Sequence, residues 1–264
     1  MSKFVIYQVL PRLFGNFNTT NKQNGSKEEN GCGKFNSFTP KALEAIKSLG
    51  ITHVWYTGVI EHATQTDYSA HGIAQDHPGV VKGKAGSAYA IKDYYDVDPD
   101  LAENVDNRMA EFEDLVKRTH EADMKVIIDF VPNHVARQYH SDAKPAGVVD
   151  LGENDHSEWA FSPLNNFYYL PNQSFTPDFD AQGYTEFPAK ATGNDQFTAS
   201  PTRNDWYETV KLNYGVNYVE GGQKQFDPIP DTWFKMRDIL LFWASKKIDG
   251  FRCDMAEMVP VEFW

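Results

Sequence analysis

The amino-acid sequence predicts an α/β fold built on a parallel sheet whose strands are buried on both faces, either an open doubly wound sheet or a barrel. Two observations favour this class. Short apolar runs alternate with stretches in which apolar residues recur at helical spacing, and long loops follow the strands. In parallel α/β folds, functional side chains lie at the carboxyl ends of the strands and in the loops that follow them.

The first part of the chain contains a strand, a helix and a second strand. The apolar run over 4–10 predicts a strand, and a long loop rich in Asn, Gly, Ser and Lys follows it. A helix is predicted from Thr39, a residue type that caps helix N-termini, to Gly50, which ends it. The second strand is predicted over 51–59.

The next elements are a helix and a third strand, after which the alternation stops. The helix is predicted over 106–124 and the third strand over 125–131. From there to residue 230 the sequence is rich in Asn, Gly, Pro and aromatic residues, and a structureless loop of that length is rare in a compact fold. We therefore predict an inserted subdomain of short irregular strands, followed by a last helix and a fourth strand over 250–255.

Composition excludes several classes of function. With 41% hydrophobic residues among 264, the chain can bury a substantial core. A net charge of −12 argues against nucleic acid or an anionic membrane surface as a partner, because both attract basic patches. The two cysteines lack the spacing of a zinc site or a disulfide framework, and no apolar segment reaches the roughly 20 residues of a membrane helix. The first apolar run lacks the features of a signal peptide, so a cytoplasmic location is expected.

The fourth predicted strand carries charges that a buried strand tolerates only when they pair or take part in chemistry. Because side chains alternate along a strand, Arg252 and Asp254 share one face. Asp129 lies near the end of the third strand, in the stretch DFVPNH. If these faces meet, a guanidinium lies between two carboxylates: Arg252 would keep Asp254 ionised, and Asp129 would hold Arg252 in place. An ionised, oriented Asp in an aromatic-lined cleft can serve as a nucleophile.

Four motifs, in the same order, resemble the α-amylase superfamily, which is glycoside hydrolase family 13. They are LGITHVWYTGVIE (49–61), SAYAIKDYYDVDP (87–99), DFVPNH (129–134) and GFRCDMAEMV (250–259). The resemblance implies a (β/α)8 TIM barrel of the α-amylase type, of which about the first four β/α units are present. It divides the chain into the first half of the barrel (1–134), an inserted domain B (135–230), and the third barrel helix with the fourth strand (231–264).

The resemblance also implies roles for the residues at the strand ends. Asp254 would be the nucleophile that forms a covalent glycosyl intermediate, with Arg252 as its charge partner and Asp129 as a supporting residue behind it. His134 would hydrogen-bond the sugar at the cleavage site, and Tyr89 would stack on that same sugar.

Four further positions concern the acceptor side and metal binding. Glu257 and Met258 fall where many members of the family have Lys and His facing the acceptor sugar. Asn133 matches a position that in many members binds a structural calcium between the barrel and domain B. Lys34 stands where calcium-binding members have an Asp in a loop after the first strand, so no ion is expected there. The resemblance requires no cofactor and leaves room for one structural calcium, at Asn133.

The function implied by the resemblance is that of a retaining glycoside hydrolase acting on α-glucosidic bonds of starch-derived glucans or maltooligosaccharides. Such enzymes use two carboxyl groups about 5 to 5.5 Å apart, and in this family the acid/base Glu follows the next strand. We therefore expect the chain to be the N-terminal part of a longer enzyme and to be inactive alone. Two alternatives stay open: a non-catalytic carbohydrate-binding or partner-subunit relative, and a glycosyl transferase or branching-type member.

Overall fold

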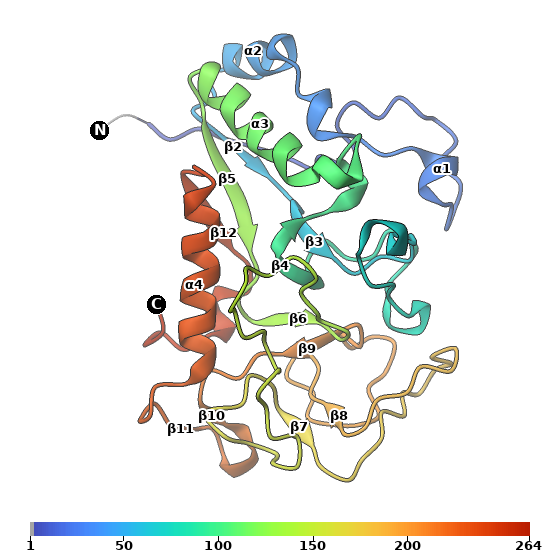
Figure 1. The fold of residues 1–264 in the computed structure, drawn as a ribbon, viewed down its shortest axis with the longest axis vertical. Helices are drawn as coiled ribbons and strands as arrows, with labels where there is room; N and C mark the ends of the chain where they lie inside the picture. The colour runs from blue at the N-terminus through green and yellow to red at the C-terminus, as the bar shows by residue number, and fades with distance from the viewer. Residues whose placement is uncertain (1–2) are drawn as a thin grey trace.

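The computed structural model of the protein describes residues 3–264 and contains a four-stranded parallel sheet (Figure 1). The strand order is β1-β2-β5-β12, with bounds Ile6–Val9, His53–Tyr56, Lys125–Phe130 and Gly250–Cys253. Each strand lies within the run that the sequence predicts for it. Neighbouring strands pair in parallel throughout this sheet, so their carboxyl ends share one edge and can bring distant residues together.

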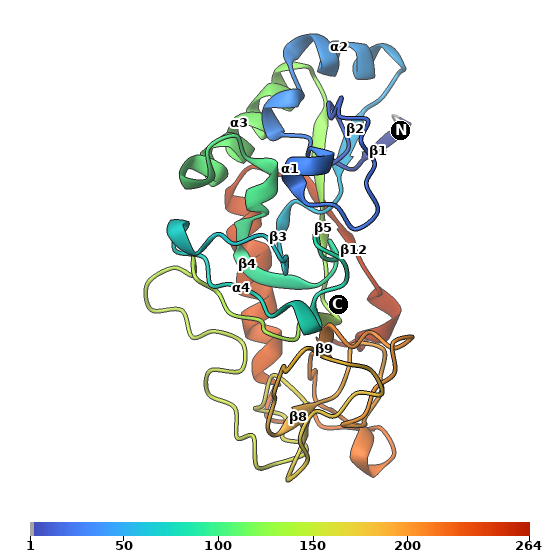
Figure 2. The same cartoon turned by 90° about the vertical axis from the view of Figure 1, so that its right-hand side faces the viewer.

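Helices α2 (Pro40–Ser48), α3 (Arg108–Glu121) and α4 (Asp231–Ser245) connect successive strands of the sheet. The Thr39 side chain accepts a hydrogen bond from Ala42 N at 3.2 Å, which confirms the predicted N-cap. Helices α3 and α4 lie on the same face of the sheet (Figures 1 and 2). Phe112 of α3 and Trp243 of α4 are fully buried and meet edge to face, with ring centroids 5.8 Å apart. This aromatic contact joins the two helices over the core.

The loops that follow the strands contain further short elements. After β2 the chain forms β3 (Ile60–His62), which pairs antiparallel with β4 (Ile91–Val97). Before α2 lies the short helix α1 (Lys27–Asn30). Single turns of 3₁₀ helix occur at Phe35–Ser37, Ser69–His71, Pro78–Val80, Pro99–Leu101, Val105–Asn107, Tyr218–Glu220 and Ala256–Met258.

The stretch between β5 and α4 has the irregular character that the sequence predicts. Its strands are two or three residues long and pair antiparallel. The pairs are β6 (His134–Ala136) with β9 (Thr209–Lys211), β7 (Tyr169–Leu170) with β8 (Ala189–Lys190), and β10 (Val216–Asn217) with β11 (Gln223–Lys224). This part occupies the lower half of Figure 1, below the carboxyl ends of the sheet strands. The division into 1–134, 135–230 and 231–264 stays a prediction.

A single large apolar cluster connects the sheet, its helices and part of the insert. Val54, Val126 and Ile128 of the sheet are fully buried in it, together with Val210 of β9. Within residues 3–264, none of the helices is both long enough and apolar enough to cross a lipid bilayer.

Candidate active site

The charged residues of β5 and β12 meet at the carboxyl edge of the sheet. Arg252 and Asp129 are direct partners in the register of these two strands, so their side chains point to the same face. The Arg252 guanidinium donates to Asp254 Oδ1 at 2.5 Å and to Asp129 Oδ1 at 3.4 Å. Asp254 N donates to Phe130 O at 2.8 Å, which anchors the turn after β12 to β5. The predicted arrangement of one guanidinium between two carboxylates is therefore present.

Asp129 is held from behind by the loop that follows β2. Its second oxygen, Oδ2, accepts a hydrogen bond from Gly58 N at 3.1 Å, and burial raises the pKa of the carboxyl group. Gly58 has a φ of +73°, and a Cβ on it would lie 2.8 Å from Ala88 Cβ. A glycine is needed here because both the backbone conformation and the close approach exclude a side chain. Asp129 thus supports Arg252 rather than facing the pocket.

The guanidinium of Arg252 also lies near two aromatic rings. Its Cζ is 5.2 Å from the ring centroid of Trp55 and 5.7 Å from that of Tyr89. Contacts of a cation with aromatic faces restrict its position without neutralising its charge. Arg252 is consequently fixed by two carboxylates and two rings, and it in turn fixes the carboxylate of Asp254.

His134 begins strand β6 and is almost completely buried. Lys211 Nζ lies 2.5 Å from the side chain of Asn133, and because an ammonium only donates, the atom facing it is the amide oxygen. The amide nitrogen of Asn133 then donates to Gly193 O at 2.8 Å and faces His134 Nδ1 at 3.1 Å. Nδ1 is therefore an acceptor, and Nε2 carries the ring proton. A neutral His134 can donate this proton to a bound hydroxyl group.

We expect His134 to remain uncharged at neutral pH. Burial lowers its pKa to about 4, and the nearby charge of Lys211 acts in the same direction. An NMR titration of the imidazole carbon-bound protons should show a midpoint near that value for His134. A midpoint of His134 near neutrality would contradict this assignment of a neutral donor.

Asp254, His134 and Tyr89 line a common pocket of about 320 Å³. Six other residues line this pocket, and the sequence analysis assigned a site role to none of them. Trp206 packs against His134 with ring centroids 5.2 Å apart, and Lys82 Nζ lies 3.0 Å from Glu208 Oε2. Trp206 and Glu208 lie just before β9, in the insert, whose richness in aromatic residues was a signal for Trp206. Lys82 lies in a Gly-rich and Lys-rich loop without any such signal. The remaining lining residues are Ser87, Thr209 and Met255.

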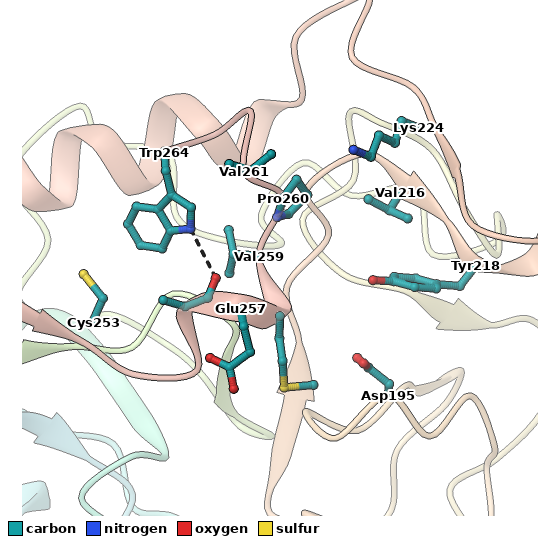
Figure 3. Close-up of a pocket in the computed structure, with 12 residues that line it drawn as sticks. Asp195, Val216, Tyr218, Lys224, Cys253, Glu257, Val259, Pro260, Val261 and Trp264 are labelled. Carbon is teal, nitrogen blue, oxygen red and sulfur yellow. Dashed lines mark hydrogen bonds between the residues drawn. The ribbon is translucent and has the colours of Figure 1, made fainter.

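Glu257 and Met258 belong to a different hollow. They lie on the 3₁₀ turn after β12 and line a volume of about 780 Å³ together with Asp195 and Tyr218 (Figure 3). Trp264 lines the same hollow, and its Nε1 donates to Ala256 O of this turn at 3.2 Å. The structure thus does not place Glu257 and Met258 in the pocket of Asp254, and their predicted contact with an acceptor sugar stays a prediction.

The surroundings of Asn133 do not fit the calcium ion suggested for this position. Calcium takes six to eight oxygen ligands, but the only oxygen of the Asn133 side chain accepts a hydrogen bond from Lys211 Nζ. The ammonium also lies 2.7 Å from Asp195 Oδ1, so this carboxylate is already paired. Among residues 3–264, no cluster of three or more His, Cys, Asp or Glu side chains has a metal-binding arrangement. Lys34, likewise, donates to two backbone carbonyl oxygens, Asp100 O and Ala102 O.

Comparison with known proteins connects this geometry to one family. The family model "Alpha amylase, catalytic domain" matches residues 8–262. An alpha-amylase from Streptomyces lividans is 25% identical over 233 residues, which cover 84% of this chain and 24% of the relative. An amino acid transporter heavy chain from Homo sapiens is 23% identical and matches 96% of this chain and 29% of its own length.

One solved structure extends the comparison to the fold. The crystal structure of an alpha-amylase from Lactobacillus plantarum aligns with a TM-score of 0.54 and 26% identity. The alignment covers 99% of this chain and 40% of that structure. The chain therefore spans about a quarter to two fifths of the length of these three proteins.

Proposed function

Because this chain belongs to the α-amylase family, we propose that the protein is a retaining glycoside hydrolase that cleaves α-glucosidic bonds in starch-derived glucans or maltooligosaccharides. Its relatives have a TIM-barrel-type fold, to which the four-stranded parallel sheet corresponds. The observation that carries the proposal is the carboxylate of Asp254, held by Arg252 in a pocket that it shares with His134 and Tyr89. This is the arrangement expected of an oriented nucleophile beside a sugar-binding surface.

The proposed reaction is a double displacement. A carboxylate oxygen of Asp254 attacks the anomeric carbon, and the bond from that carbon to the leaving sugar oxygen breaks as a second carboxyl group protonates this oxygen. Water, deprotonated by the same second carboxylate, then attacks the anomeric carbon and releases Asp254. Arg252 does not transfer a proton in either step; its hydrogen bond keeps Asp254 in the attacking orientation.

The second carboxyl group is the acid and base of this reaction. Glu208 lines the pocket, but its pairing with Lys82 suits the binding of sugar hydroxyl groups better than the donation of a proton. Asp129 is occupied by Gly58 N and Arg252. The expectation that the acid/base Glu lies outside residues 3–264 stays a prediction.

Two residues are assigned to binding of the reacting sugar. His134 would donate its Nε2 proton to a hydroxyl group, since its Nδ1 faces the amide nitrogen of Asn133. Tyr89 would present its ring to the apolar face of the sugar, and its half-buried position keeps the ring in place. Both contacts would hold the anomeric carbon near Asp254.

Replacing Tyr89 with Ala should lower kcat/KM for maltooligosaccharides by roughly 10- to 100-fold, because removing a ring that packs on the apolar face of the sugar loses about 1.5 to 3 kcal/mol of apolar contact. The conservative change Tyr89→Phe should retain most of the activity, since it keeps the ring and removes only the hydroxyl group. Steady-state kinetics on both variants would check this. Equal losses in the two variants would show that the hydroxyl group, and not the ring, is the important part.

The proposed activity can be tested with the natural protein and maltooligosaccharides of defined length. We expect release of reducing sugar, and proton NMR taken early in the reaction should show the α-anomer as the first product, because two displacements retain the configuration. An initial β-anomer would exclude Asp254 as a nucleophile. Accumulation of longer oligosaccharides in place of reducing sugar would identify a glycosyl transferase that uses the same first step.

A second candidate function is a non-catalytic role in carbohydrate binding or as a partner subunit. The observation that favours it is the similarity to a transporter heavy chain, a protein whose name describes no hydrolysis. Calorimetric titration with a maltooligosaccharide separates the two candidates. Binding without release of reducing sugar over long incubation would support the binding protein, whereas turnover supports the hydrolase.

A further inference from the structure

The side chain of Lys211 forms a buried junction between three segments that are distant in sequence. Lys211 is the last residue of β9 and only 2% exposed. Its ammonium group lies 2.5 Å from Asn133 Oδ1, 2.7 Å from Asp195 Oδ1 and 3.5 Å from Met258 O. These oxygens come from the end of β5, from a loop of the insert and from the turn after β12. One cation therefore joins the segments that follow β5 and β12 to a loop of the insert.

The oxygens around Lys211 are of the types that a hard metal ion selects. An amide oxygen, a carboxylate oxygen and a backbone carbonyl oxygen are typical calcium ligands. Here the ammonium occupies the space between them and supplies the positive charge. We propose that the Lys211 ammonium takes the place of a metal ion that would bridge these oxygens, so that the junction of the parallel sheet with the insert requires no calcium. This inference concerns folding and site geometry and does not depend on the proposed hydrolysis.

The same junction determines how His134 is presented. Lys211 and His134 are partners in the register of β9 and β6, and the Lys211 ammonium fixes which end of the Asn133 amide faces His134 Nδ1. The loop that carries Asp195 also packs tightly here, since a Cβ on Gly193 would lie 2.8 Å from His134 Cβ. Lys211 is thus a positioning residue: it acts on His134 through Asn133 and through the Asp195 loop.

The test uses thermal unfolding of the protein with calcium and with a chelator. For the wild type we expect the same Tm in millimolar calcium and in excess EDTA. Lys211→Met should lower the Tm by about 5 to 10 °C, because it leaves the Asn133 oxygen and the Asp195 carboxylate without a partner. This loss should be unaffected by calcium, since the variant adds no ligand. A wild-type Tm that falls in EDTA, or an unchanged Tm in Lys211→Met, would overturn the proposal.

A second variant converts the junction into a metal site. Lys211→Asp removes the ammonium and adds a carboxylate, so that two carboxylates, an amide oxygen and a carbonyl oxygen surround the vacated space. Calcium should raise the Tm of this variant by at least about 5 °C over its value in EDTA, because a ligand that binds only the folded state stabilises it. Lys41→Asp, an exposed substitution with the same charge change, is the control and should not respond to calcium. If calcium does not change the Tm of Lys211→Asp, the space around the Lys211 ammonium does not suit a metal ion, which would contradict the proposal.

The positioning role has its own readout. In the wild type, nitrogen-15 chemical shifts of His134 should report the tautomer with the proton on Nε2. In Lys211→Met only the hydrogen bond to Gly193 O still orients the Asn133 amide, and a mixture of tautomers or loss of the single form is expected. If His134 keeps a single tautomer in Lys211→Met while the Tm falls, Lys211 contributes only to stability. That result would overturn its proposed action on His134.

Discussion

Replacing Asp254 with Asn should abolish turnover while leaving the fold intact. We expect kcat/KM for maltooligosaccharides to fall on the order of 10⁴-fold or more, because an amide cannot form the glycosyl ester on which the double displacement depends. The fold should persist, since Asn has the same shape and its Oδ1 can still accept the hydrogen bond from Arg252. Steady-state kinetics and the Tm of Asp254→Asn, each compared with the natural protein, would check both parts of this expectation.

A nearby aspartate provides the matched control for this variant. Asp249 precedes the same strand at its other end, where Lys125 and His120 lower its pKa to about 2 against the opposing effect of desolvation. Asp249→Asn should therefore reduce stability and leave kcat/KM nearly unchanged. Retained turnover in Asp254→Asn would show that Asp254 is not the nucleophile. Equal losses in both variants would mean that the first result reports damage to the strand.

Replacing Glu61 with Gln should stabilise the protein at neutral and alkaline pH. Glu61 is 1% exposed on β3, opposite Asp93 of β4, and among the described residues neither of its carboxyl oxygens has a hydrogen-bond partner. Desolvation first, and then the charge of Asp93, raise its pKa to about 9, while Lys92 and Arg108 oppose the shift. Asp93 accepts hydrogen bonds from Ser141, Tyr95 and Ala143, so of the two facing groups Glu61 is the one that keeps a proton.

The pH dependence follows from this raised pKa. The pKa of Glu61 is 4.5 in the unfolded chain and about 9 in the folded protein, so folding takes up a proton at every pH between these values. The free energy of unfolding should therefore fall as the pH rises through this range. At neutral pH the free energy of unfolding lost in this way is about 3 kcal/mol, which corresponds to roughly 6 to 12 °C in Tm for a chain of this size.

Melting curves over a series of pH values would check the Glu61 prediction. The difference in Tm between Glu61→Gln and the wild type should increase with pH up to about 9 and then level off. Glu121→Gln, which removes an exposed carboxylate at the end of α3, is the control and should show no such trend. A Glu61→Gln variant that is less stable than the wild type at neutral pH would show that Glu61 is ionised and paired in the folded protein.

Much of the candidate site was predictable because its residues lie in short motifs on regular strands. The alternation along β12 placed Arg252 and Asp254 on one face, and the strand end DFVPNH placed Asp129 beside them. A period of two needs only neighbouring residues, so the sequence alone carries this information. The same local information located the four parallel strands and the N-cap at Thr39.

Other features of the site needed the folded chain. The family resemblance suggested calcium at Asn133, and nothing near that residue in the chain indicates that an ammonium from 78 positions away lies against its oxygen. The pairing of Lys82 with Glu208 likewise joins two residues that are distant in the sequence, so no local pattern indicates it. Glu257 and Met258 follow Asp254 closely in sequence, yet the turn after β12 directs them to a separate hollow.

The four strands of the parallel sheet, the helices between them and the nucleophile candidate follow from local patterns in the amino-acid sequence, and the family resemblance follows from the order of four short motifs. The contacts of Lys211, the tautomer of His134 and the burial of Glu61 without a hydrogen-bond partner among residues 3–264 emerge only in the folded chain. These properties depend on which polar atoms are brought together when water is excluded, and irregular loops set that arrangement. Such loops have no periodicity from which the arrangement could be read.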